Sequence, residues 1–220
     1  IGGRFGFHDC GETANTQVAL FDFQPAPLIC EVRNLSTGKG SSSIGKLRGR
    51  TGGVVIDCEG GYFAGDASGG AFFDRQGKKI EDLKKGDSAA DLERKHLSAF
   101  LAGVRSRKTG DLTAEALEGH RSTACCHMAN VSHRLGRKTY PEAIVAGIKA
   151  NAELADAFER CRTYLHENGV ELDATPATLG PWVSLDAEKG HFVSDFADAT
   201  NELSRREYRT PYVVPDLTAG

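Results

Sequence analysis

The chain has 220 residues, of which 40% are hydrophobic and 26% charged, a composition typical of a soluble globular protein. Its 27 basic and 30 acidic side chains nearly balance, which excludes a global electrostatic attraction to nucleic acid or to an acidic membrane surface. The sequence has no run of about 18 apolar residues, so we expect no membrane-spanning helix. Six scattered cysteines without a C-x-x-C pair indicate buried free thiols and a reducing compartment.

The first third of the chain is rich in short strand-forming segments. Residues 16–23 and 28–32 flank a proline-containing turn, which predicts a hairpin. Because no helical pattern interrupts the segments that follow, we expect an antiparallel meander. Its strands are predicted at residues 54–56, 62–64, 71–73 and 79–80.

The middle of the chain carries helical patterns. Ser88 is a predicted N-cap, and the apolar spacing of residues 97–104 predicts the helix that follows it. A second helix is predicted over about residues 113–135. A third begins at Pro141, a favoured first-turn residue, and is expected to break near Asn151.

The last part of the chain is predicted to be helical up to residue 169 and then to return to strands. Residues 182–185 and 191–193 flank a glycine-containing turn, which predicts a last hairpin, and residues 195–203 predict a short helix. The fold class we expect is therefore α+β. It has an open, mainly antiparallel β-sheet with helices packed on one face, in a single domain over residues 1–220.

Two glycine-rich segments are candidate nucleotide sites. Residues 40–47 nearly match the phosphate-binding motif G-x-x-x-x-G-K-[ST], but Leu47 lacks the final hydroxyl and the residues that follow are poor helix formers. Residues 2–6 contain glycines without a preceding strand, and the chain shows no strand–helix–strand alternation. We therefore predict no Rossmann domain and no cofactor site within this chain.

Several polar residues are grouped on the predicted second helix. His120, Cys125, Cys126 and His127 do not predict a zinc site, because residues of one helix cannot close a tetrahedral shell alone. His120 and His127 share one flank with Arg134, where they pack against another domain, line a cleft or satisfy local hydrogen bonds.

The polar segment 8–16 is equally open to two interpretations. It is either a plain turn or a sugar-binding loop at the edge of a sheet. No G-x-S-x-G nucleophile elbow occurs.

Several motifs follow one another in a fixed order along the chain. They are Gly2-Gly3-Arg4-Phe5-Gly6, Gly11-Glu12-Thr13-Ala14-Asn15-Thr16, Glu31-Val32-Arg33-Asn34-Leu35, Cys58-Glu59-Gly60-Gly61-Tyr62, residues 104–108, 118–122, 126–130 and 134–136, Leu179-Gly180-Pro181-Trp182 and residues 203–209. Taken together, these motifs resemble the C-terminal domain of the Gfo/Idh/MocA family of NAD(P)-dependent oxidoreductases, in particular its bacterial, sugar-type branch. The resemblance covers nearly the whole chain and departs from the usual pattern at Ala14, where this branch commonly has proline.

The resemblance implies a two-domain parent enzyme. A Rossmann domain that binds NAD or NADP, together with the catalytic residues, would precede Ile1, and the absence of an initiator methionine suggests such a missing part. This chain alone would then be inactive and would bind neither cofactor nor metal. The expected partners are a small sugar-like substrate, the chain's own Rossmann domain and further copies that associate through the sheet, but neither nucleic acid nor a membrane.

The resemblance also implies which residues contact the substrate, a sugar or polyol-like alcohol whose hydroxyls suit Arg, Asn and carboxylate partners. Two alternatives stay open: a standalone carbohydrate-binding or oligomerisation module, and a domain of an NAD-using glycoside-cleaving enzyme. The expected location is the cytoplasm, with an export signal ahead of Ile1 left open. The candidate substrate-binding residues are Arg4, His8, Glu12, Asn15, His120 and His127.

Overall fold

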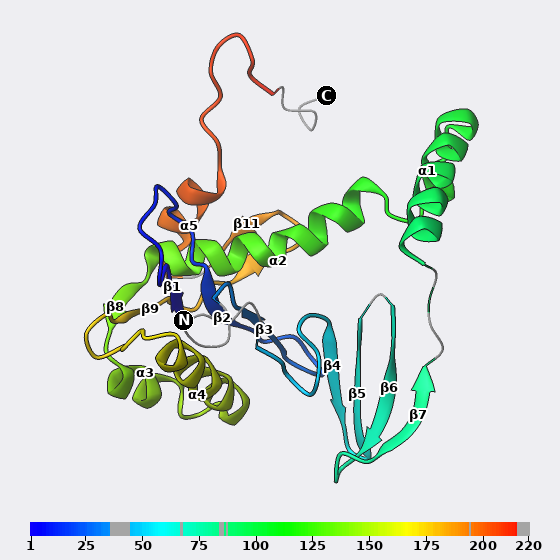
Figure 1. Cartoon of the computed structure of the whole chain (residues 1–220). Helices are drawn as coiled ribbons and strands as arrows, with labels where there is room; N and C mark the ends of the chain where they lie inside the picture. Colours follow the sequence, from blue (N-terminus) through cyan, green and yellow to red (C-terminus); the bar gives the residue numbers. More distant parts are fainter. Residues whose placement is uncertain (36–44, 67, 84–85, 87, 194, 215–220) are drawn as a thin grey trace. The chain divides into compact units, whose positions relative to one another are not determined.

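The computed structural model describes residues 1–35, 45–66, 68–83, 86, 88–193 and 195–214 (Figure 1). The chain divides into two compact units, Ile1–Asn34 with Thr123–Gly220, and Leu35–Ser122. Both contain helices and antiparallel strands, which confirms the α+β class with open sheets. The prediction of one domain stays a prediction. Residues 40–44 of the phosphate-motif near-match lie outside the described residues.

The first unit is built on a five-stranded antiparallel sheet with the strand order β3-β2-β1-β9-β8. The sequence predicts the β2–β3 hairpin, but not β1, β8 or β9, because two or three residues are too few to show an alternating pattern. The strands are β1 (Gly2–Gly3), β2 (Thr16–Phe21), β3 (Leu28–Val32), β8 (Arg137–Thr139) and β9 (Ala177–Leu179).

Helices contact both faces of this sheet, whereas the sequence led us to expect them on one face. On one face α4 packs against β2 and β3, and its Arg160 pairs with Glu31 of β3, which lies opposite Val18 of β2. On the other face Gln17 of β2 donates a hydrogen bond of 3.1 Å to the Ala129 carbonyl of α2. The helices with residues in this unit are α2 (Ala116–Leu135), α3 (Pro141–Ile148), α4 (Ala152–Glu167) and α5 (Ala197–Ser204).

The core of the first unit centres on α4. Phe158, Cys161 and Leu165 of α4 are buried, as is Ile144 of α3. Burial raises the pKa of the Cys161 thiol to about 11. All six cysteines are free, but Cys161 is the one cysteine that is buried, so the prediction of free thiols is confirmed and that of burial is wrong for the other five.

Side-chain caps fix the predicted helix starts. The Ser88 hydroxyl accepts a hydrogen bond from the Asp91 backbone N–H, which begins α1. The Asn151 side chain accepts one from Leu154, so the break predicted near this residue is the start of α4. The last hairpin, β10 (Leu185–Asp186) with β11 (His191–Phe192), precedes α5 as predicted.

The second unit contains a four-stranded antiparallel meander, as predicted. The register places Ile56, Phe63 and Phe72 on one face, where the rings of Phe63 and Phe72 lie 5.2 Å apart. The Phe63 ring lies across Gly65 and Gly70, at each of which a Cβ would come within 2.5 Å of it. The strands are β4 (Val54–Cys58), β5 (Gly61–Asp66), β6 (Gly69–Asp74) and β7 (Lys79–Leu83).

The helical part of the second unit contains α1 (Ala89–Ser106), a single 3₁₀ turn (Thr109–Asp111) and the start of α2. The predicted apolar stripe of α1 is present on the helix, but its side chains are exposed. These residues are Leu97, Phe100, Leu101 and Val104. Among the described residues no helix has both the length and the apolar character that crossing a membrane requires.

Two neighbouring residues of α3, one buried and one partly exposed, provide a test of the core described above. Ile144→Ala removes a side chain that is 0% exposed and leaves a cavity, so we expect the free energy of unfolding to fall by about 2–5 kcal/mol. Val145→Ala, next to it and 37% exposed, is the matched control and is expected to change it by less than about 0.5 kcal/mol. Urea unfolding of the two variants measures the difference, and equal stabilities would contradict the core described above.

Candidate functional site

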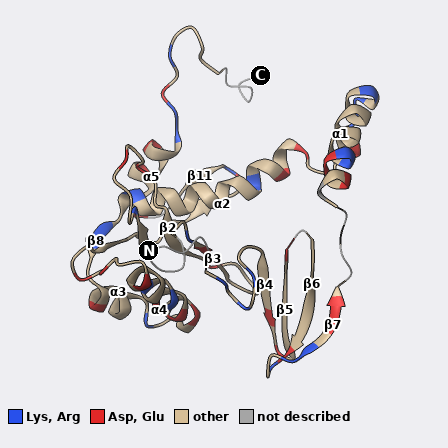
Figure 2. Cartoon of the chain, in the orientation of Figure 1, with Lys and Arg blue, Asp and Glu red and all other residues tan. Residues whose placement is uncertain are grey.

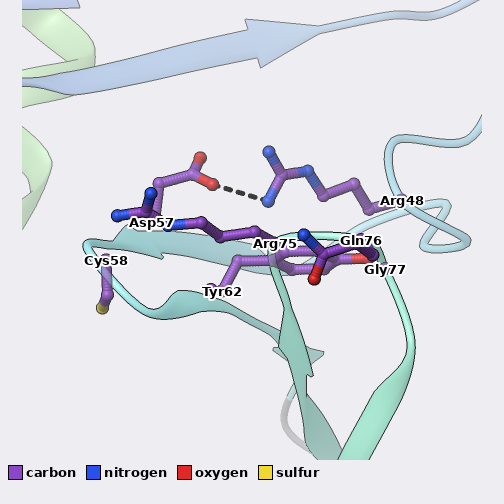
Figure 3. Close-up of a pocket in the computed structure, with 8 residues that line it drawn as sticks. Arg48, Asp57, Cys58, Tyr62, Arg75, Gln76 and Gly77 are labelled. Atoms are coloured by element: carbon purple, nitrogen blue, oxygen red, sulfur yellow. Dashed lines mark hydrogen bonds and ion pairs between the residues drawn. The ribbon is translucent and has the colours of Figure 1, made fainter.

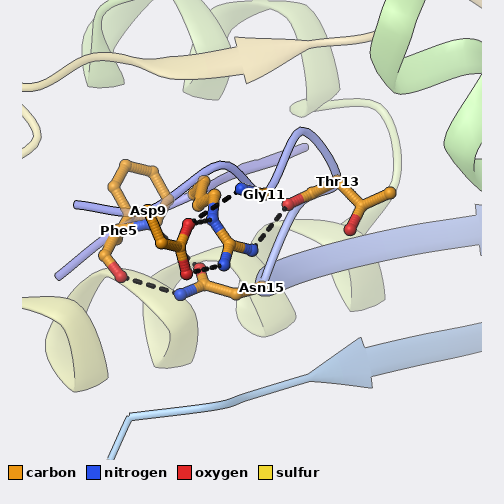
Figure 4. A network of polar contacts seen from close by, with 6 residues as sticks. Phe5, Asp9, Gly11, Thr13 and Asn15 are labelled. Carbon is orange, nitrogen blue, oxygen red and sulfur yellow. Dashed lines mark hydrogen bonds and ion pairs between the residues drawn. The ribbon is translucent and has the colours of Figure 1, made fainter. Parts of the chain in front are cut away.

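The candidate site is the loop of residues 4–15, which connects β1 to β2 (Figure 4). Its two ends are joined by Asn15, whose side chain is 5% exposed. The Asn15 amide accepts a hydrogen bond of 2.9 Å from the Phe5 N–H and donates one of 2.7 Å to the Phe5 carbonyl. The Asn15 N–H also donates to the Gly3 carbonyl at 3.0 Å. These bonds close the loop at its base.

An ion pair spans the interior of the loop. The Arg4 guanidinium forms two hydrogen bonds with the Asp9 carboxylate, one of them from Nε to Oδ1 at 2.6 Å, and a third of 3.3 Å with the Thr13 carbonyl. The Gly11 N–H donates to Asp9 Oδ1 at 3.0 Å. A Cβ at Gly11 would lie 2.2 Å from Arg4 Cζ, so this packing requires glycine. Arg4 thus ties three parts of the loop together.

The same contacts explain the acidity of Asp9. The hydrogen bonds from Arg4 and from the Gly11 N–H favour the ionised carboxylate and lower the pKa of Asp9 to about 2. The pKa of Arg4 is raised by the same pair. The ion pair is therefore intact at neutral pH.

The candidate residues of the loop fall into two groups. Arg4 and Asn15 use their side chains to hold the loop, whereas His8 and Glu12 are exposed on it. Sequence reasoning did not select Asp9, which organises the loop. The available signal was an acidic residue close to a loop arginine, where a local ion pair is expected.

The two candidate histidines of α2 are both exposed, but they do not belong to the same unit. His127 lies in the part of α2 that belongs to the first unit, where Val131 faces the core and the Ser132 hydroxyl donates to the Pro181 carbonyl at 2.7 Å. His120 belongs to the second unit. The structure therefore gives no support for a site that combines His120 with the loop.

The glycine segment of residues 2–6 lacks the geometry of a dinucleotide-binding turn. The glycines of residues 2–6 form β1 and the start of a loop that leads into β2, so no helix N-terminus is available there for a pyrophosphate. In the part of the chain that the structure describes, no group of three or more His, Cys, Asp or Glu residues could hold a metal ion.

Comparison with known proteins gives no further guide. No family model, curated protein or solved structure matches the chain. The loop must therefore be judged by its own chemistry. It offers an exposed imidazole and an exposed carboxylate, at His8 and Glu12, on a backbone that an ion pair and a buried amide hold in place.

The ion pair predicts a measurable carboxyl titration. The native pKa of Asp9, about 2, lies below its ordinary value of 3.8, so the pair contributes its full stability above the ordinary value. That contribution falls as the pH drops from the ordinary value through about 2. We expect ¹³C NMR of the Asp9 carboxyl to show a midpoint near 2 in the native chain and a higher midpoint in Arg4→Gln, still below 3.8 because the Gly11 N–H continues to bind the carboxylate.

Arg137→Gln, which removes an exposed arginine of β8, is the control and should leave the Asp9 midpoint unchanged. A midpoint in Arg4→Gln as low as in the unsubstituted chain would show that Arg4 does not hold the carboxylate.

Proposed function

We propose that this chain is the substrate-side domain of an NAD(P)-dependent oxidoreductase acting on a sugar or polyol-like alcohol. The observation that carries the proposal is the loop of residues 4–15. The Arg4–Asp9 ion pair and the Asn15 side chain hold this loop in place, and His8 and Glu12 are exposed on it. A carboxylate accepts hydrogen bonds from neighbouring hydroxyls, and an imidazole donates or accepts one. Because the loop is fixed before a ligand arrives, little ordering entropy opposes binding.

The role of the domain is to orient the substrate. A bound nicotinamide, held by a preceding domain, would supply the hydride chemistry. The residues of this chain would bind the hydroxyls beside the reacting carbon and fix its direction. The motif order that resembles the Gfo/Idh/MocA family supports this assignment, with His8 and Glu12 as the substrate-binding residues and His127 as a further candidate.

The full-length gene product provides the test. We expect it to reduce NAD or NADP with at least one member of a panel of sugars and polyols. Glu12→Gln and His8→Asn should each lower kcat/KM by about tenfold, since each removes a hydrogen bond to the substrate. Glu188→Gln, at an exposed carboxylate in the β10–β11 turn, is the matched control and should leave kcat/KM unchanged.

The reaction products of the full-length protein distinguish the proposed function from the two alternatives. Cleavage of a glycoside without net NADH would assign the parent to the glycoside-cleaving alternative. Sugar binding by this chain without any turnover of the full-length protein would indicate a binding module. If neither nicotinamide turnover nor sugar binding occurs, the proposed function is wrong.

Association of copies through a sheet is also part of the proposal. It is supported by the face of the β4–β7 sheet that carries Val54, Ile56 and Phe72, which are 45%, 51% and 42% exposed. Exposed apolar side chains that are contiguous on one sheet face are typical of an interface.

Ile56→Lys tests this face. A charge in the middle of the apolar face should shift the chain toward monomers in sedimentation equilibrium, because an interface core excludes charged side chains. Lys79→Gln, at an exposed position of β7, is the control and should keep the mass of the unsubstituted chain. A monomeric unsubstituted chain would contradict the proposed association.

A further inference from the structure

A polar concavity lies in the β4–β7 sheet, and no residue of the loop 4–15 lines it. It has a volume of about 450 Å³ and lies where β4 turns into β5 and β6 turns into β7 (Figure 3). Figure 2 shows charged residues of both signs at this end of the sheet. The charged side chains that line the concavity are Arg48, Asp57 and Arg75, two cations and one anion.

Arg48 is held by a strained turn. It has a φ of 47° and is followed by Gly49 with a φ of 83°, between Leu47 and Arg50, which exchange two backbone hydrogen bonds of 2.9 Å. Such a turn ordinarily has asparagine or glycine at the position of Arg48, because other side chains disfavour positive φ. An arginine at this position indicates that its side chain has a role.

The guanidinium of Arg48 is fixed over an aromatic pair. Arg48 Cζ lies 3.9 Å from the centroid of the Tyr62 ring, and that ring stacks on Phe73 with centroids 4.8 Å apart. Arg48 also donates to Asp57 Oδ1 at 2.6 Å, as the dashed line in Figure 3 shows. The Asp57 side chain is 68% exposed, so it can leave this contact without repacking the sheet.

Arg75 comes from a turn that is equally well fixed. The Asp74 carboxylate accepts hydrogen bonds from the N–H groups of Gln76 and Lys78, at 3.0 and 2.8 Å. Arg75 Nε donates to the Glu59 carbonyl of the neighbouring turn. Within the described residues, the two terminal nitrogens of Arg75 have no partner and Arg75 has no acidic residue in an ion pair. The guanidinium of Arg75 is therefore fixed in position, and its two terminal nitrogens can still donate hydrogen bonds to a ligand.

We propose that this concavity binds a small oxyanion, the phosphate or carboxylate group of a small-molecule ligand, between Arg75 and Arg48. A guanidinium fork matches two oxygens of either group, and the contact is strongest when the fork is already oriented. The Gln76 amide lines the same concavity and adds a neutral donor. The Asp57 carboxylate competes with such a ligand, because it pairs with the Arg48 guanidinium until an external anion displaces it.

Titration of the chain with inorganic phosphate, and separately with malonate, tests the site at constant ionic strength. We expect saturable shifts of the backbone amide NMR signals around the concavity for at least one of the two anions. Arg75→Gln and Arg48→Gln should each weaken binding by about tenfold, the usual effect of losing one charged hydrogen bond. Asp57→Asn should tighten binding several-fold, since it removes the competing carboxylate.

Arg94→Gln is the matched control, because Arg94 forms an ion pair with Asp91 on the exposed side of α1. Its affinity should equal that of the unsubstituted chain. The gain in Asp57→Asn cannot arise from unfolding, so it keeps the proposal testable even if Arg48→Gln loosens the hairpin. No saturable binding of either anion, or equal affinities in Arg75→Gln and Arg94→Gln, would overturn the proposal.

Discussion

The first unit depends on how closely the chain packs around two glycines. Gly2 and Gly3 form β1, the middle strand of the five-stranded sheet, and Gly2 pairs with Gln17 of β2 on one side and Thr178 of β9 on the other. A Cβ at Gly2 would lie 2.6 Å from the Thr16 carbonyl oxygen. Only a residue without a side chain fits there, so these glycines let β2 and β3, early in the chain, form one sheet with β8 and β9.

The same constraint fixes the loop that follows. The Phe5 ring lies over Gly3, where a Cβ would come within 2.5 Å of it, and Phe5 is 2% exposed. Asn15 then holds the Phe5 backbone through both ends of its amide. The sheet, the buried ring and the amide therefore form one continuous support, and Arg4 with Asp9 extends it outward. Exposed side chains on such a support keep their directions, which is what recognition of a hydroxyl-bearing ligand requires.

The sequence predicts most elements of this fold because their signals are local. The cap at Ser88, the helix break near Asn151 and the short strands of the meander depend on neighbours a few residues away, and each is present. Strands β1, β8 and β9 are different, since each is too short to show a pattern and depends on pairing with distant residues. Gly2 of β1 pairs with Thr178 of β9, and Arg137 of β8 pairs with Leu179 of β9. The loop shows the same limit. Its polar residues are visible in the sequence, but which of them face solvent depends on a partner, Asp9, that composition does not single out.

Two arginines show why a residue type alone does not define a binding site. Arg4 directs Nε and both terminal nitrogens at acceptors of its own loop, the Asp9 carboxylate and the Thr13 carbonyl. Each of its three guanidinium nitrogens is engaged within the loop, and its contribution is structural. Arg75 commits only Nε, to the Glu59 carbonyl, which orients the fork and leaves its terminal nitrogens free within the described chain. A guanidinium that is oriented but unsatisfied attracts an external anion, because binding then replaces water without first breaking a protein contact.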